Sequence, residues 1–174
     1  MHRPLVPVTI LSTLLLLSLS LFAGCGGGGD EKAAEKVAET IMEKAGGGKA
    51  DVDIEDGKIS VKGEGFSMEA SETDEWPKDM PGSVPEFTYG KLTAVTDIKS
   101  PDHEGRKIDV HFQEIESGAF EKYQKDLEKA GWRIHRASKN ESGGMLMAEK
   151  GEELHLVFGW DNEERTGTVM FMTE

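Results

Sequence analysis

Cys25 is the only cysteine of this 174-residue chain, and it stands directly after a largely apolar run. Arg3 supplies a positive start, residues 8–22 supply the apolar stretch, and Ala23 and Gly24 are the small residues before the cysteine. This order is typical of an exported lipoprotein signal, which is cleaved so that the cysteine becomes the mature N-terminus. With no second cysteine in the sequence, we expect the fold to hold together by core packing rather than by disulfides.

The Cys25 thiol is expected to carry a diacylglycerol, with a further acyl chain on the new amino group. Stable anchoring needs at least two chains, because each buried CH₂ contributes only about 0.8 kcal/mol. The signal departs from the usual pattern in one respect, since Phe22 stands where Leu is common and Leu21 is one step further back. An uncleaved transmembrane anchor is the rival interpretation. Pro4 and Pro7 argue against it, because they leave a run shorter than the ~20 apolar residues that a spanning helix needs.

We therefore expect an extracytoplasmic protein, attached to the cell membrane by lipid on Cys25. Gly26 follows the cysteine where Asp would act as a retention signal, so the outer membrane is expected if the cell has two. Removing residues 1–24 takes away one of the 20 basic side chains and none of the 33 acidic ones. Such negative charge repels phosphates, so nucleic acid is not an expected partner.

Residues 25–29 comprise the lipidated cysteine and a flexible glycine tether. Asp30 is then placed as a helix N-cap, and Gly46 ends the periodic pattern that follows. Small and apolar residues recur at helical spacing at Ala34, Val37, Ala38, Ile41, Met42 and Ala45. This pattern predicts a helix of about four turns. Because its apolar stripe is narrow and rich in alanine, we expect the helix to dock on the rest of the fold.

Apolar and polar residues alternate on both sides of Asp56-Gly57, which is a two-residue turn signal. The pattern predicts a β-hairpin with one apolar face and one charged face. The expected partners are Ile54 with Ile59, Val52 with Val61, Glu55 with Lys58, and Asp51 with Lys62. Residues 66–70 are expected to add a third strand.

Asp51, Asp53 and Glu55 resemble the start of an EF-hand calcium loop. The remainder of the loop does not fit. Asp56 stands where the sharp turn needs glycine, and Lys62 stands where a bidentate glutamate is needed. We interpret these acids as a solvated strand face and predict no metal site.

Residues 71–86 contain three prolines within nine residues, which predicts an extended connector. It separates a helix and β-hairpin unit at residues 30–70 from a domain at residues 87–174. The second domain is expected to have the element order β-β-α-β-β-β-β, beginning with a long strand over residues 87–98. We therefore predict an α+β fold, an antiparallel sheet with one packed helix, preceded by the N-terminal helix and hairpin.

The helix of the second domain has clear end signals. Ser117 is expected to be its N-cap, and Gly131 its C′ residue. Its buried stripe is expected to be Phe120, Tyr123, Leu127 and Ala130. The strand before the helix is expected to turn Ile108, Val110 and Phe112 to one side, and the last strand of the chain to turn Val169 and Phe171 inward.

The chain as a whole resembles a group of uncharacterised bacterial lipoproteins that contain a domain of unknown function. The resemblance rests on the lipobox and glycine tether, the charged N-terminal helix, the hairpin at residues 52–61, the connector from Trp76-Pro77 to Val84-Pro85, and Tyr123 to Leu127 followed by Gly131-Trp132. It implies an exported, anchored protein. It implies no activity, cofactor or site residue.

No catalytic, cofactor-binding or metal-ligating residue is predicted. Four histidines follow the signal, His103 in a loop and His111, His135 and His155 in strands, and none shows metal-ligand spacing. His135 and His155 could approach each other across the sheet, but single strand histidines are mostly surface groups. Residues 161–164, Asp-Asn-Glu-Glu, are interpreted as a solvated hairpin loop.

Several large apolar side chains near the C-terminus are expected in the core: Trp132, Phe158, Trp160, Met145, Met147, Met170 and Met172. If one sheet face lacks cover, they would instead form an apolar binding surface. Two functions of different class stay open. The first is a non-enzymatic module that binds a protein, peptide or apolar ligand, or has a structural role in the envelope. The alternative is a small hydrolase or metal-dependent enzyme with a carboxylate and histidine site.

Overall fold

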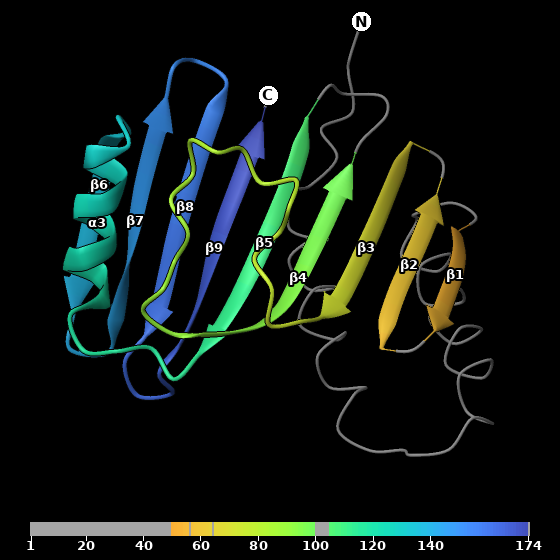
Figure 1. Cartoon of the computed structure of the whole chain (residues 1–174), viewed down its shortest axis with the longest axis horizontal. Coiled ribbons are helices and arrows are strands. Elements are labelled where there is room, and N and C mark those ends of the chain that lie inside the picture. Colours follow the sequence, from red (N-terminus) through yellow and green to blue (C-terminus); the bar gives the residue numbers. More distant parts are fainter. Residues whose placement is uncertain (1–49, 56, 64, 100–104, 174) are drawn as a thin grey trace, which may run out of the picture.

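The computed structural model describes residues 50–173, except residues 56, 64 and 100–104 (Figure 1). The signal, Cys25, the glycine tether, the expected helix at residues 30–45 and His103 lie outside the described residues. The described elements are β1 (Ala50–Glu55), β2 (Lys58–Gly63), β3 (Phe66–Glu72), β4 (Lys91–Lys99), β5 (Arg106–Gln113), α3 (Ala119–Lys129), β6 (Arg133–Asn140), β7 (Gly143–Lys150), β8 (Leu154–Asp161) and β9 (Thr166–Thr173). None of these elements is a helix long and apolar enough to cross a membrane.

All nine strands belong to one antiparallel sheet, in the order β1-β2-β3-β4-β5-β9-β8-β7-β6. The predicted α+β class is therefore wrong, since 58% of the described residues are in strands and 9% in the one helix, which is an all-β-like fold. The reason is that β3 pairs with β4, with Ala70 opposite Thr96. The prolines begin only after β3 has ended, so the connector does not interrupt this pairing.

The predicted hairpin register is confirmed. β1 and β2 pair Ile54 with Ile59 and Val52 with Val61, while Glu55 lies opposite Lys58 and Asp51 opposite Lys62. Local alternation and the turn dipeptide were sufficient to fix this register, because a slip by one residue would reverse both faces.

The main core lies between one face of the sheet and a cover formed by α3 and the connector, residues 73–90. Figure 1 shows the yellow-green connector crossing β5, β9 and β8 on the same side as the helix. The buried strand residues on this face are Ile108, Val110, Phe112, Leu146, Ala148, Leu156, Phe158, Val169 and Phe171. Phe87 of the connector packs its ring against Phe112, Tyr123 and Phe158, with centroids 4.6, 5.1 and 4.9 Å away. The strand and helix residues predicted to point inward are thus confirmed, with Ala130 only partly buried.

Two buried aromatic side chains hold the connector in place through their polar tips. The Trp132 indole N–H donates to the Ser83 carbonyl at 2.7 Å, and the Tyr123 hydroxyl donates to the Pro85 carbonyl at 3.2 Å. Buried Trp and Tyr side chains need hydrogen-bond acceptors for their polar tips. The connector carbonyls can serve as these acceptors because the connector is not paired in the sheet. The connector is therefore an ordered part of the core cover.

The ends of α3 differ in how well the sequence predicted them. Gly131 has φ 82°, and the Trp132 N–H bonds the Leu127 carbonyl, which is the predicted glycine C-terminal motif. The N-cap is Gly118 at φ 76°, without a side-chain cap, so the assignment of Ser117 is wrong. A left-handed residue was needed at this point, and glycine adopts that conformation without strain. The predicted strand at residues 87–98 is also shorter, because Phe87 turns into the core before β4 begins.

The apolar side of the sheet changes between β3 and β5. One face of the sheet is covered by α3 at its other end. On β1 to β3 this same face carries charged and small polar residues, including Asp53, Ser60 and Glu69. Apolar residues of these strands lie on the opposite face, where Val52 and Val61 are buried. The same opposite face carries Met145, Met147, Met170 and Met172 on β7 and β9, so these four partly buried residues are not in the main core.

Candidate ligand-binding pocket

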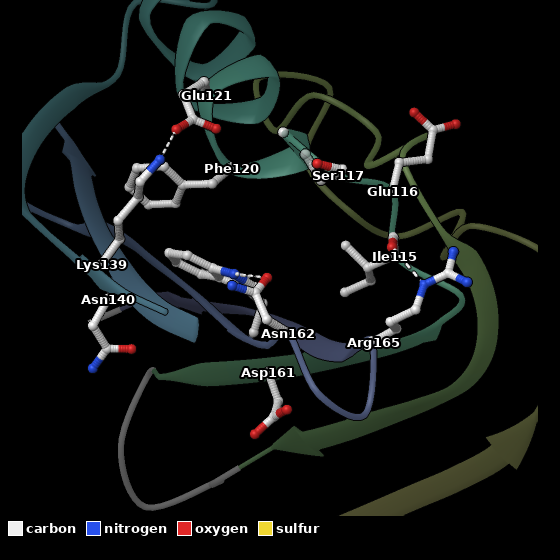
Figure 2. A pocket seen from close by; sticks show the side chains of 13 residues that line it. Ile115, Glu116, Ser117, Phe120, Glu121, Lys139, Asn140, Asp161, Asn162 and Arg165 are labelled. Atoms are coloured by element: carbon white, nitrogen blue, oxygen red, sulfur yellow. Dashed lines mark hydrogen bonds and ion pairs between the residues drawn. The ribbon is translucent and has the colours of Figure 1, made fainter. Parts of the chain in front are cut away.

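A cavity of about 550 Å³ opens at one end of the sheet, where α3 begins and where β6 and β8 end (Figure 2). Its lining comes from three segments that are distant in the sequence. The lining residues are Ile115, Glu116, Ser117, Gly118, Ala119, Phe120, Glu121, Lys139, Asn140, Trp160, Asp161, Asn162 and Arg165. A cavity of this size falls within the range of small-molecule sites.

Aromatic rings form the apolar part of the cavity. The Trp160 ring lies 4.5 Å from that of Phe120 on α3 and is stacked on Phe158 along β8 at 5.7 Å. Trp160 fits here because Gly144 is its neighbour on β7, and a side chain at that position would collide with the indole. The Trp160 N–H donates to the Asn162 amide oxygen at 3.1 Å. Trp160 was predicted as core, but it is only partly buried and borders the cavity.

An ion pair closes one side of the cavity. Lys139 at the end of β6 bonds the Glu121 carboxylate in the first turn of α3, and its ammonium lies 6.0 Å from the Phe120 ring centroid. The hydrogen bond from Lys139 is the main cause that holds the pKa of Glu121 below its usual value. Glu121 is therefore ionised at neutral pH. On the other side, Lys122 pairs with Glu116 at 2.7 Å.

The β8–β9 turn forms the rest of the rim and is held by its own hydrogen bonds. The Asp161 carboxylate accepts the N–H groups of Glu163 and Glu164 at 2.8 and 2.9 Å. Asn162 donates its amide to the Glu141 carbonyl at 2.9 Å, and Arg165 donates Nε to the Ile115 carbonyl at 3.2 Å. The predicted solvated loop at residues 161–164 is indeed a turn, and its first two residues also line the cavity. These hydrogen bonds within the protein fix the shape of the rim.

The three described histidines, His111, His135 and His155, do not line this cavity. His135 is exposed on the edge strand β6, and β7 separates it from His155 on β8, so the two strands are not neighbours. His111 on β5 contacts the Thr168 hydroxyl at 3.1 Å, and burial lowers the pKa of its imidazole despite the opposing charge of Asp109. Within the described ranges, no three His, Cys, Asp or Glu side chains are placed to hold a metal ion.

Sequence reasoning missed the cavity because its parts come together only in the fold. Lys139 and Glu121 are 18 positions apart, and neither belongs to a motif. One signal for the cavity was available in the sequence: Trp160 stands immediately before the polar run at residues 161–164. A tryptophan at the end of a strand is placed where apolar and solvated regions meet, which is where a binding site can form.

Comparison with known protein families, with curated proteins and with solved structures gives no match to this chain. The resemblance to uncharacterised bacterial lipoproteins therefore stays a prediction from the sequence motifs. The geometry of the cavity and the charge of the chain are the remaining basis for proposing a function.

Proposed function

We propose that this protein is a lipid-anchored, extracytoplasmic binding protein that holds a small neutral ligand in the cavity beside α3. The observation that carries the proposal is a preformed cavity with an aromatic floor and a rim of charged groups that are already partnered. Sites of this kind bind through apolar contact and a few directed polar groups.

The partnering of the rim favours a neutral ligand over a charged one. Lys139 is neutralised by Glu121, and Asp161 and Arg165 are directed at backbone groups of their own loops. A charged ligand would have to break one of these contacts and leave its former partner less well compensated. A neutral molecule with one apolar face and several hydroxyl groups needs no such exchange, because carboxylate and guanidinium groups keep further bonding capacity.

The same contacts support binding rather than proton transfer. A general acid needs a carboxyl whose pKa is raised toward neutrality. Glu121 has its pKa lowered by Lys139, so it is a poor proton donor at neutral pH. The alternative of a hydrolase or metal-dependent enzyme gains no specific support from the cavity.

The proposed location rests on Cys25 and its preceding apolar run. The formal net charge of −13 also favours attachment through lipid, because an acidic surface is repelled by anionic headgroups. A binding protein fixed by lipid at a membrane surface would meet its ligand outside the cytoplasm.

Isothermal titration calorimetry with the full chain carrying Cys25→Ser would test the ligand class. The panel contains neutral aryl glycosides, matched sugar phosphates and unsubstituted sugars. We expect binding of at least one neutral aryl glycoside, and at least tenfold weaker binding of its phosphate. Ser117→Phe, which fills the cavity from an exposed lining position, should abolish binding, whereas Ser138→Phe on the opposite face of β6 should not. Equal binding by both variants, or no neutral ligand at all, would overturn the proposal.

A further inference from the structure

The sheet face opposite α3 carries an apolar patch over β1, β2 and β3, which we name the N-terminal apolar face. It consists of Val52, Ile54, Ile59, Val61, Met68 and Ala70. The strand pairing places these residues in two adjacent rows, Val52-Val61-Met68 and Ile54-Ile59-Ala70. Side chains in such rows are in direct contact across the strands and form one continuous surface.

Part of this face is buried, although the described cover of the sheet lies on the other side. Val52 is 4% exposed and Val61 is 3% exposed. Both stand outside the main core cluster, and among the described elements β1 and β2 contact only their neighbours in the sheet. No described element therefore covers these two valines on this face of the sheet.

We propose that residues 30–45 cover the N-terminal apolar face, with the stripe of Ala34, Val37, Ala38, Ile41, Met42 and Ala45 directed at it. The stripe would supply the small and apolar contacts for both rows of the N-terminal apolar face, while the Glu-rich side of the segment stays in solvent. Neither surface buries its apolar side chains alone. Docking of an amphipathic helix on an open sheet face is the common solution in layered folds.

The connection is short enough to enforce this arrangement. Residues 46–49 separate the stripe from the first residue of β1, and four residues span at most about 14 Å. A 16-residue helix is about 24 Å long, which exceeds the width of four strands, about 19 Å at about 4.8 Å each. The segment can therefore cross β1 to β4 without leaving the edge at which the chain enters the sheet.

Thiol labelling in the full chain with Cys25→Ser tests the proposal. Ile59→Cys places a single thiol on the N-terminal apolar face, and Ser60→Cys places one on the other face of the same strand. The two variants are matched, because Ile59 and Ser60 both have intermediate exposure. We expect N-ethylmaleimide to label Ile59→Cys at least tenfold more slowly than Ser60→Cys. Adding Ile41→Asp, which puts a charge in the stripe, should raise the Ile59→Cys rate at least tenfold. Lys36→Asp, which puts the same charge on the opposite side of the segment, should not.

Crosslinking provides a second measurement that does not require destabilising the segment. A short bis-maleimide should join Met42→Cys to Ile59→Cys within one chain, and should fail with Lys36→Cys in place of Met42→Cys. Equal labelling of the two β2 thiols, or no effect of Ile41→Asp together with no crosslink, would overturn the proposal. Labelling of Ile59→Cys that slows as protein concentration rises would also overturn it, because a second copy would then be the cover.

Discussion

The Lys107 ammonium lies 2.9 Å from the Asp109 Oδ2, two residues along β5 on the sheet face opposite α3. The Asp109 side chain is 1% exposed, whereas that of Lys107 is 28% exposed. Among the described residues, no donor makes a directed hydrogen bond to either Asp109 oxygen. Lys107 therefore supplies a positive charge beside this buried carboxylate, and it is the partner that the described part of the chain pairs with it.

Removal of the Lys107 charge should destabilise the fold. Lys107→Met should lower the free energy of unfolding by about 3–5 kcal/mol, because it leaves an unpaired charge buried. The double variant Lys107→Met with Asp109→Leu should recover most of the loss, since neither charge is then present. Urea unfolding at pH 7 measures both, with Lys91→Met at an exposed position of β4 as the control. A loss below about 0.5 kcal/mol for Lys107→Met would contradict this view of the pair.

Two glycines on neighbouring strands should respond differently to alanine. A Cβ at Gly144 would collide with the Ser138 carbonyl and the Trp160 ring, and would lie 2.8 Å from the Lys139 Cα. We expect Gly144→Ala to cost about 1–3 kcal/mol and to shift the tryptophan emission as Trp160 moves. A Cβ at Gly159 meets no atom within 4 Å, so Gly159→Ala should be neutral or slightly stabilising. Thermal unfolding with fluorescence detection compares them directly, and similar behaviour of the two variants would refute the steric argument.

Leu127 is completely buried in the α3 stripe. Leu127→Ala should cost about 2–5 kcal/mol, because it leaves a cavity in the core. Cys25→Ser should leave the unfolding temperature unchanged, since four glycines separate that position from the first periodic residue. Calorimetry on both variants beside the unlipidated parent makes the comparison. An early transition in the Cys25 variant would show that the anchor region contributes to the fold.

Lipidation itself is a separate prediction. The intact mass of protein extracted from membranes should correspond to a chain that begins at Cys25 and carries a diacylglycerol. A retained leader, or a free thiol at Cys25, would remove the basis for the proposed anchor.

Asp97 on β4 should make stability depend on acid pH. Burial raises the pKa of its carboxyl, but Arg106 outweighs this and holds it below the ordinary value of 3.8 by donating two hydrogen bonds of 2.9 and 2.7 Å. A lowered folded-state pKa adds stability above the unfolded-state value, and this stability is lost as the pH falls through the folded-state value. Asp97→Asn should therefore lower stability at pH 7 and flatten its decline below about pH 4. Urea unfolding between pH 2.5 and 7 measures the slope, and an unchanged slope would count against the pair.

Features determined by neighbouring residues could be predicted from the sequence. The β1–β2 register, the end of α3 at Gly131 and the inward residues of β5 and β9 depend on alternation, helical spacing or one turn residue. The fold class could not be predicted in this way, because the pairing of β3 with β4 spans the connector and depends on long-range packing. Asp109 illustrates the same limit, because alternation assigns it to a polar face, whereas the structure buries it.

The candidate cavity was even less predictable. It joins the end of β6, the first turn of α3 and the β8–β9 turn, and its ion pair of Lys139 and Glu121 exists only because β6 lies beneath the helix. Nothing in the local sequence around either residue encodes that proximity.

The edge strand β6 bears on how the protein behaves in a crowded solution. An uncovered strand edge can recruit the same edge of another molecule and begin aggregation. Arg133, Arg136 and Lys139 are exposed along β6, where Arg133 pairs with Glu149 and Lys139 with Glu121. A bulge between Ile134 and Arg136 also interrupts the regular pairing of β6 with β7. Two such edges brought together would have to desolvate these charged groups on strands that are not straight. The colloidal stability of the protein should therefore depend on these few side chains, and their replacement by threonine or valine should promote self-association.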